Sequence, residues 1–207
     1  MYKTVSNKCA VSLTSKLIGH TLKECRNSGL PVVKIFSEKQ KGKTFGERIT
    51  NALEYAFSLG YNNIIVSGTD APSVNRAQFR QINFRLQTDD LVTAPAKDGG
   101  VCLFGIKKEA FKRESFLLLP WLTAHLHQSL SVYALEHHLA FSDIPGGLDV
   151  DDLSDTLKIC TKVNSWFSSL IKSLFDENNF QILPSASLYP PAEILTCQVL
   201  RGPPVHF

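Results

Sequence analysis

Residues 62–73 read NNIIVSGTDAPS, and this stretch decides the fold class. The three apolar residues 64–66 are typical of a short buried β-strand. Asp70 and Pro72 follow directly. Ligands of open α/β sheets bind at the carboxyl ends of the strands, so Asp70 has the position of a ligand-binding residue. The local alternative is a turn in which Asp70 bonds its own backbone ahead of Pro72. This stretch alone leaves both interpretations open.

Helical and strand periodicities alternate on both sides of this stretch. A mainly parallel, mixed sheet with helices on its faces is the arrangement that such alternation favours. The link KDGG is too short for a parallel crossover, so its two flanking strands are expected to be antiparallel or splayed. The predicted strands are residues 31–36, 62–68, 90–96 and 101–106. The predicted helices are residues 17–25 after a cap at Thr14, a helix opened by the capping box of Thr44 and Glu47, one capped by Ser73, and one from about Thr123.

The character of the sequence changes after residue 160. Apolar residues at helical spacing over 163–174 predict an amphipathic helix. The tail from 181 to 207 is rich in proline, so it is not expected to be regular helix, and we expect it to wrap the domain or contact a partner. Two segments are therefore expected, a main domain over 1–160 and a C-terminal helix with an extended tail over 161–207.

Composition narrows the class of protein. The 207 residues carry a formal net charge of +3, which gives no basic signature for nucleic-acid binding. No apolar run approaches the ~20 residues that span a membrane, and the N-terminus lacks the apolar stretch of a signal peptide. The five cysteines are dispersed without a CxxC pair, which favours thiols in a reducing compartment. A cytoplasmic protein is expected.

Several side chains outside residues 62–73 could carry chemistry. Asp149 and Asp151 flank Val150, so on an extended segment they point the same way and could hold a cation between them. The structural alternative is a helix cap with solvated neighbours. Asp98-Gly99-Gly100 is a hairpin-turn signal, and its glycines also allow a ligand to approach the backbone.

A further candidate is the stretch GKTFGER, residues 42–48. Gly46 lies in the first turn of the predicted helix, where glycine is unfavourable, so it indicates close packing or close approach. Arg48 is either an anion-binding residue at a helix N-terminus or a surface residue.

Some familiar sites are absent from the sequence. Residues 42–44 read GKT, but Ser37 stands where a P-loop needs its first glycine. There is no GxSxG, no HExxH, and no GxGxxG after a first strand. The histidines near 125–138 lack the spacing of a zinc site, so they are expected in the core or at the surface.

Five segments, in this order, resemble one family. They are GKTFGER, SGTDAPS, APAKDGGVCLFGI, LPWLT and LDVDDLSDTL. The chain is similar over about residues 14–158 to a family of unknown function known as radical-SAM/selenodomain-associated transferases. That family belongs to the nucleotide-diphospho-sugar transferase (GT-A) superfamily. The resemblance implies a GT-A-like three-layer α/β sandwich and a divalent metal, Mg or Mn, at a site for a nucleotide or nucleotide-sugar.

The resemblance also implies roles for individual residues. Asp70 and the Asp149/Asp151 pair would hold the metal, and Asp70, Asp98 and Asp151 would be the catalytic carboxylates. The acceptor side would be lined by Asp98, Lys97, Gly99 and Gly100, and the indole of Trp121 would stack on a sugar or base while Thr123 caps its helix. Near the nucleotide would lie Gly46, Glu47 and Arg48.

The N-terminus departs from the family pattern. Members of the family begin with an apolar strand and a basic, glycine- or proline-containing loop that holds the nucleotide, whereas residues 1–16 read MYKTVSNKCAVSLTSK. The first strand and nucleotide loop are therefore missing or altered. Two hypotheses follow: a transferase that moves a sugar or nucleotidyl group to a small acceptor, and a GT-A-derived binding or scaffold protein without turnover. A metal-dependent phosphohydrolase is a third, more distant alternative.

Overall fold

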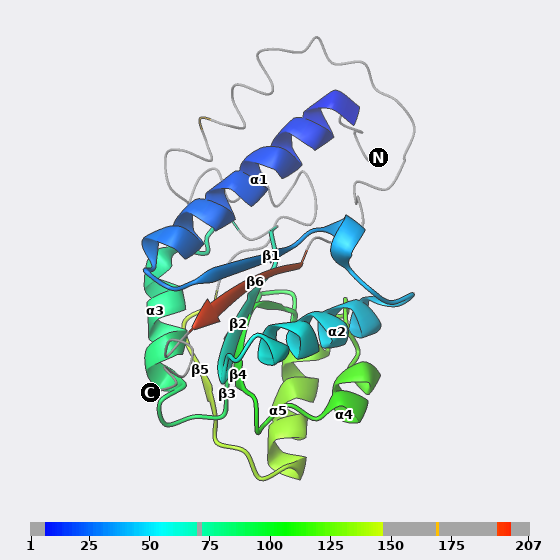
Figure 1. Ribbon diagram of the computed structural model, residues 1–207, viewed down its shortest axis with the longest axis vertical. Coiled ribbons are helices and arrows are strands. Elements are labelled where there is room, and N and C mark those ends of the chain that lie inside the picture. Colours follow the sequence, from blue (N-terminus) through cyan, green and yellow to red (C-terminus); the bar gives the residue numbers. More distant parts are fainter. Residues whose placement is uncertain (1–6, 70–71, 147–168, 170–193, 200–207) are drawn as a thin grey trace.

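The computed structural model describes residues 7–69, 72–146, 169 and 194–199, and these form a three-layer α/β sandwich around one mixed sheet (Figure 1). The strand order is β1-β6-β2-β4-β3-β5. Strands β1, β2, β3 and β5 run in one direction, while β4 and β6 run in the other. The strands are β1 (Val32–Ile35), β2 (Asn63–Ser67), β3 (Leu91–Pro95), β4 (Val101–Lys107), β5 (Phe141–Asp143) and β6 (Ile194–Val199).

Two hydrophobic clusters fix the helices to the two faces of this sheet. One face is covered by α2 (Phe45–Ser58), α4 (Arg113–Leu118) and α5 (Leu126–Glu136). The other face is covered by α1 (Asn7–Asn27) and α3 (Arg76–Arg85). A short 3-10 helix, Ser37–Lys39, links β1 towards α2. Alternation along each strand supplies both clusters: Ile64 and Val66 belong to the first, and Ile65 belongs to the second.

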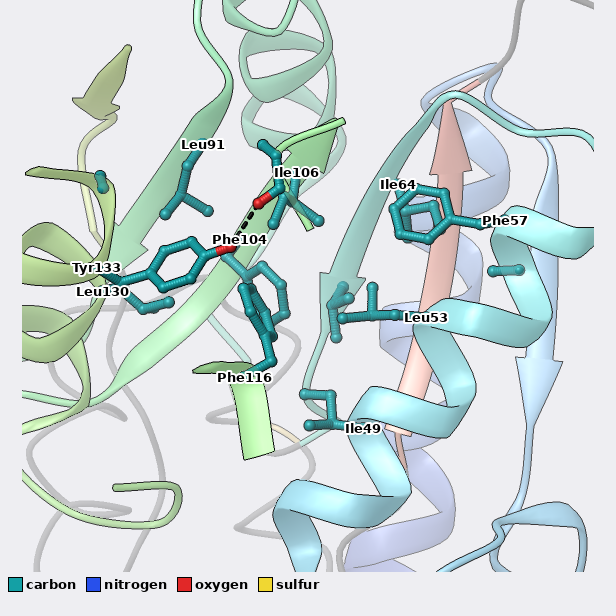
Figure 2. Packing of buried hydrophobic residues seen from close by; sticks show 14 of the residues in the cluster. Ile49, Leu53, Phe57, Ile64, Leu91, Phe104, Ile106, Phe116, Leu130 and Tyr133 are labelled. Carbon is teal, nitrogen blue, oxygen red and sulfur yellow. Dashed lines mark hydrogen bonds between the residues drawn. The ribbon is translucent and has the colours of Figure 1, made fainter. Parts of the chain in front are cut away.

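The first cluster has an aromatic centre (Figure 2). The ring of Phe116 lies 5.1 Å from that of Tyr133 and 5.1 Å from that of Phe111, both edge-on. Edge-to-face pairs are favoured by the ring quadrupoles. Tyr133 is buried, and its hydroxyl donates to the carbonyl of Ala110 and accepts from the backbone N–H of Lys112 at 3.1 Å. The one polar atom of this aromatic group is therefore satisfied.

Most of the predicted elements are confirmed. Thr44 and Glu47 form the predicted capping box at the start of α2. Strands β3 and β4 pair in antiparallel register across the KDGG link. The predicted mixed sheet is present: β3 and β5 pair in parallel, and the other four pairs of neighbouring strands are antiparallel.

The starts of helices α1 and α3 differ from the prediction. Helix α1 begins at Asn7, ahead of the predicted cap at Thr14. Helix α3 is capped by Asn75, whose side chain accepts from Ala77 and Gln78, and the predicted cap at Ser73 is wrong. An Asn with a Gln three residues later forms a reciprocal capping box, which outcompetes the earlier serine.

Residues near the C-terminus supply one strand of the sheet. Strand β6 lies between β1 and β2 and is antiparallel to both. The sequence predicted an extended tail there without assigning it to the sheet. The predicted helix over 163–174 lies outside the described residues except at Ser169, which is helical.

The helices and the cysteines bear on two further expectations from the sequence, about membrane spans and about thiols. None of the helices in the described part of the chain is both long and apolar enough to cross a membrane. Cys25 is fully buried and disulfide-bonded, so the expectation of a thiol is wrong at this residue. Cys102 is buried as well.

Candidate functional site

The carboxyl ends of the four like-directed strands share one edge of the sheet. The loop after β2 leaves from this edge and leads to Asp70, three residues beyond Ser67. Ser67 is buried, and its hydroxyl donates to the carbonyl of Gly68 at 2.8 Å. The sequence placed Asp70 at a strand end, and β2 does end at Ser67. Asp70 itself lies outside the described residues.

The other metal ligands that the family resemblance implies also lie outside the described residues. Asp70, Asp149 and Asp151 fall outside the described residues. Within the described ranges, no three His, Cys, Asp or Glu side chains lie close enough together to hold a metal ion. Carboxylate oxygens are the ligands that Mg²⁺ prefers, so the donor chemistry of the three aspartates fits this ion. Their convergence remains a prediction.

The Asp98-Gly99-Gly100 turn joins β3 to β4 at the same edge. Asp98 is exposed, and its Oδ1 accepts from the backbone N–H of Gly100 at 2.9 Å. Gly99 has a φ of +92°, which favours glycine. The turn closes through the N–H of Ala96, which donates to the carbonyl of Gly100 at 3.0 Å. Lys97 is exposed beside it.

This turn is also fixed to the start of α5. The backbone N–H of His127 donates to the carbonyl of Gly99 at 3.1 Å. A Cβ added at Gly99 would lie 2.0 Å from the carbonyl oxygen of Ala124. The glycine therefore serves a close approach between two backbone segments, and only Gly fits there.

The N-terminus of α2 forms a second part of the site. Glu47 accepts from the backbone N–H groups of Lys43 and Thr44, and these two bonds, in that order, lower the pKa of its carboxyl. Arg48 Nε donates to the carbonyl of Gly42 at 3.2 Å. The carboxylate of Glu47 thus caps the helix, and the Nε–H of Arg48 is bonded to the adjoining loop. A contact of either with a nucleotide stays a prediction.

Gly46 connects α2 to the loop between α4 and α5. A Cβ at Gly46 would lie 2.8 Å from Cδ1 of Trp121 and 3.3 Å from the carbonyl oxygen of Leu117. The indole N–H of Trp121 donates to the carbonyl of Phe116 at 2.8 Å. Rings of Phe45, Phe104 and Phe116 surround the indole with centroids 6.0 Å away. These contacts give the half-buried indole a packing role, and its predicted stacking on a sugar or base remains untested.

Thr123 organises the turn that follows Trp121. Its hydroxyl donates to the carbonyl of Pro120 at 2.7 Å and accepts from the N–H of His125 at 3.2 Å. Helix α5 starts at Leu126, and its N-cap residue is His125 without a side-chain cap bond. The prediction that Thr123 caps this helix is therefore wrong, because the helix starts three residues later and Thr123 caps the preceding turn instead. Leu122, which lies between Trp121 and Thr123, has a positive φ of 62°.

Sequence reasoning missed a polar group at this edge. His127 Nε2 lies 3.0 Å and 3.1 Å from the two carboxylate oxygens of Asp143. Thr93 is fully buried and donates its hydroxyl to Asp143 Oδ1. Asp143 is the last residue of β5 and Thr93 is its register partner on β3. No strand was predicted at residues 141–143, so nothing in the sequence pointed to this group.

His20 of α1 supports the loop that carries Asp70. Its Nε2 donates to the carbonyl of Val74 at 3.2 Å. Burial lowers the pKa of the His20 imidazole, and this exceeds the opposing effect of the hydrogen bond to Val74. The ring is therefore neutral at pH 7 and holds α1 against the segment after Pro72.

Comparison with known proteins places this geometry in context. A family model described as "Uncharacterized protein conserved in bacteria (DUF2064)" matches residues 10–123. No curated protein matches the chain. The fold is similar to the crystal structure of a Desulfovibrio desulfuricans protein provisionally named a nucleotide-diphospho-sugar transferase. The TM-score is 0.70 at 24% identity, over 84% of this chain and 87% of that chain. At this identity the similarity establishes the fold alone.

Proposed function

The chain belongs to the DUF2064 family of proteins conserved in bacteria, and from this premise we propose that it is a metal-dependent transferase. It moves a glycosyl or nucleotidyl group from a nucleotide or nucleotide-sugar donor to a small acceptor. The similarity of its fold to a protein provisionally named a nucleotide-diphospho-sugar transferase supports this proposal. The resemblance to radical-SAM/selenodomain-associated transferases is part of the same proposal.

The observation that carries the proposal is the joining of three loops at one edge of the sheet. The turn after β3 contacts the start of α5 through Gly99, and the start of α2 contacts the loop before α5 through Gly46. Both contacts are too close for a side chain on the glycine. The two contacts fix the shape of loops at the edge of the sheet where ligands of open α/β sheets bind. Fixed loops on rigid elements are what binding and catalysis require.

The residues then have distinct tasks. Asp70, Asp149 and Asp151 would hold Mg or Mn, and the ion would supply positive charge for the phosphates of the donor. Asp98 and Lys97 are exposed on the rigid turn and would contact the acceptor. Arg48 would meet a phosphate at the start of α2. The remaining contribution of the protein is to position donor and acceptor.

One observation favours the alternative, a GT-A-derived binding or scaffold protein without turnover. Where the family resemblance implies a first strand and nucleotide loop, residues 7–27 form the helix α1. The place in the sheet between β1 and β2 is filled by β6 from the C-terminal segment. The phosphate-holding loop of a first strand is therefore not supplied by residues 7–27.

Thermal denaturation of the full chain tests the proposal. A panel of nucleotides and nucleotide-sugars is added with Mn²⁺ or Mg²⁺. A ligand at 100 times its Kd stabilises the native state by ~2.7 kcal/mol, which is a readily measured shift. We expect at least one donor to raise the melting temperature only when the metal is present.

Matched variants locate the site. Asp70→Asn, Asp149→Asn and Asp151→Asn are expected to remove the shift, and Asp98→Asn to weaken it. Glu136→Gln, which changes an exposed carboxylate at the far end of α5, is expected to keep it. If no member of the panel shifts the wild type, and Asp70→Asn melts like it, the scaffold alternative is favoured.

A further inference from the structure

We propose that His127 accepts the proton of the attacking hydroxyl in the transfer reaction, and that Asp143 and Thr93 position its ring. This inference rests on the proposed function, because it adds a proton acceptor to the site of the transferase. It starts from three polar side chains at the carboxyl edge of the sheet. His127 lies in the first turn of α5, Asp143 ends β5, and Thr93 lies on β3.

The three side chains are joined by hydrogen bonds. His127 Nε2 lies 3.0 Å from Asp143 Oδ1 and 3.1 Å from Asp143 Oδ2. The hydroxyl of Thr93 donates to the same Oδ1. An ionised carboxylate can only accept, so the proton between the ring and Asp143 is on Nε2. In the neutral imidazole, Nδ1 then carries the unshared electron pair, and this atom is the one that can take up a proton.

The ring of His127 is held in place without being closed off from solvent. Its side chain is 29% exposed and that of Asp143 is 41% exposed, so a small molecule can reach the pair. Nδ1 has no hydrogen-bond partner among the residues that the structure describes. The electron pair on Nδ1 is therefore not used by this part of the chain.

The sheet places the two positioning residues. Thr93 and Asp143 are register partners on the parallel strands β3 and β5. The register pair two residues earlier is Leu91 and Phe141, and both pack in the first hydrophobic cluster, on the face that α5 covers. Residues two apart on a strand share a face, so Thr93 and Asp143 lie on this face as well. Polar side chains thus replace apolar ones where the face meets His127.

Thr93 is the least expected member of the group. The residue is fully buried, and a buried hydroxyl costs free energy unless it is hydrogen-bonded. An ion pair as exposed as that of His127 and Asp143 contributes little to stability. Orientation of a reactive ring accounts for both observations, because a base in an active site is itself held in one direction by a third group.

His127 also lies beside the turn that the proposed function assigns to the acceptor. Its backbone N–H donates to the carbonyl of Gly99 at 3.1 Å. Lys97 and Asp98 directly precede Gly99 in this turn. The helix that carries the base and the turn that would contact the acceptor are therefore fixed to each other by a backbone bond.

The proton transfer balances within the transfer reaction. The acceptor oxygen forms a bond to the transferred group as its proton passes to Nδ1 of His127. The bond between that group and the leaving phosphate oxygen breaks, and this oxygen keeps the electron pair. The imidazolium that forms is stabilised by the carboxylate of Asp143. After the products leave, the exposed ring returns its proton to water.

Nitrogen-15 NMR of the histidine rings tests the geometry without a substrate. The full chain is studied at about pH 8, where imidazoles in water are neutral. Long-range couplings should show the proton of His127 on Nε2, and the signal is assigned by its absence from His127→Gln. Asp143→Asn should lose this single tautomer, because an amide donates as well as accepts. A wild-type ring with its proton on Nδ1 would overturn the proposal.

Turnover tests the role itself. The probe is a nucleotide or nucleotide-sugar that raises the melting temperature with Mn²⁺ or Mg²⁺, and water is the acceptor. His127→Gln should lower kcat for release of the leaving group by roughly 100- to 10,000-fold, the usual contribution of a general base. The shift in melting temperature should persist, which also shows that the variant folds. Asp143→Asn and Thr93→Val should lower kcat while KM stays unchanged.

His125→Gln is the matched control, since His125 is an exposed histidine two residues earlier, and it should keep the wild-type kcat. Equal kcat for wild type and His127→Gln, with the donor still bound, would overturn this proposal and leave the proposed function standing. A panel in which no donor shifts the melting temperature, or a bound donor that the wild type does not turn over, would refute the proposed function and this inference with it.

Discussion

Gly46 of α2 lies against Trp121, so closely that a Cβ at residue 46 would be 2.8 Å from the indole Cδ1. Glycine inside a helix normally costs about 1 kcal/mol relative to alanine. The contact offsets this cost because it lets α2 approach the loop after α4, where the indole is held by its bond to Phe116. The position is thus set by packing and not by helix propensity.

Replacing this glycine should therefore destabilise the protein. Gly46→Ala is expected to lower the free energy of unfolding by about 1–3 kcal/mol, because the held indole must move. Gly19→Ala is the matched control, since Gly19 is also helical but a Cβ there meets nothing within 4 Å. The control should raise stability by up to ~1 kcal/mol. Urea denaturation measures both, and a Gly46→Ala protein at least as stable as wild type would refute the packing argument.

Gly99 allows the same kind of test at the other loop contact. Gly99 and Gly60 share a φ of +92°, but only at Gly99 would a Cβ collide, 2.0 Å from the Ala124 carbonyl. Gly60→Ala should cost only the backbone strain, about 1–3 kcal/mol. Gly99→Ala should cost roughly 1–3 kcal/mol more, because two backbone segments must separate. Equal unfolding midpoints for the two variants would show that the turn yields freely.

Local sequence signals predicted the parts of the fold that depend on neighbouring residues. The capping box of Thr44 and Glu47 is formed within one helical turn, and the β3–β4 pair is dictated by a short link. The start of α1 was predicted too late, because residues 7–13 carry little apolar periodicity and Thr14 offers a plausible cap.

Features that depend on distant pairing were not predictable. Strand β6 has a neighbour on each side in the sheet, yet its partners Val32 and Ile65 are more than 130 residues away in sequence. Nearby prolines also argue against a strand there. His127 and Asp143 meet only because α5 and β5 return to the same edge. The sequence did indicate close approach at Gly46 and Gly99, but it could not name Trp121 and Ala124 as the groups approached.

Tyr133 should tolerate loss of its hydroxyl poorly. Burial raises the pKa of its phenol to about 12, so the group stays protonated at neutral pH. The hydroxyl donates to the carbonyl of Ala110 (Figure 2) and accepts from the backbone N–H of Lys112. Tyr133→Phe leaves that carbonyl and that N–H without this partner. A cost of about 1–3 kcal/mol is expected in chemical denaturation. Tyr55→Phe, at a 53% exposed tyrosine, should stay within ~0.5 kcal/mol of wild type. If the two variants are equally stable, the hydroxyl of Tyr133 contributes nothing.

His20 should make stability depend on pH. Its pKa is lowered in the folded protein, chiefly by burial, from the ordinary histidine value of about 6.5. Between the lowered value and 6.5 the unfolded chain binds more protons than the folded one, so stability falls as pH drops through this window. Below the lowered pKa both states are protonated and the contribution stays constant. Above 6.5 the contribution is fully present.

The variant His20→Gln isolates this effect. Glutamine can still donate to the Val74 carbonyl but cannot be protonated, so the variant should lose less stability than wild type between about pH 8 and about pH 5. His125→Gln, at an exposed histidine whose side chain makes no cap bond, should keep the wild-type profile. The free energies of unfolding of the three proteins, measured across this pH range, test the prediction. A constant difference between wild type and His20→Gln would mean that α1 does not bury the imidazole against the segment that follows Asp70.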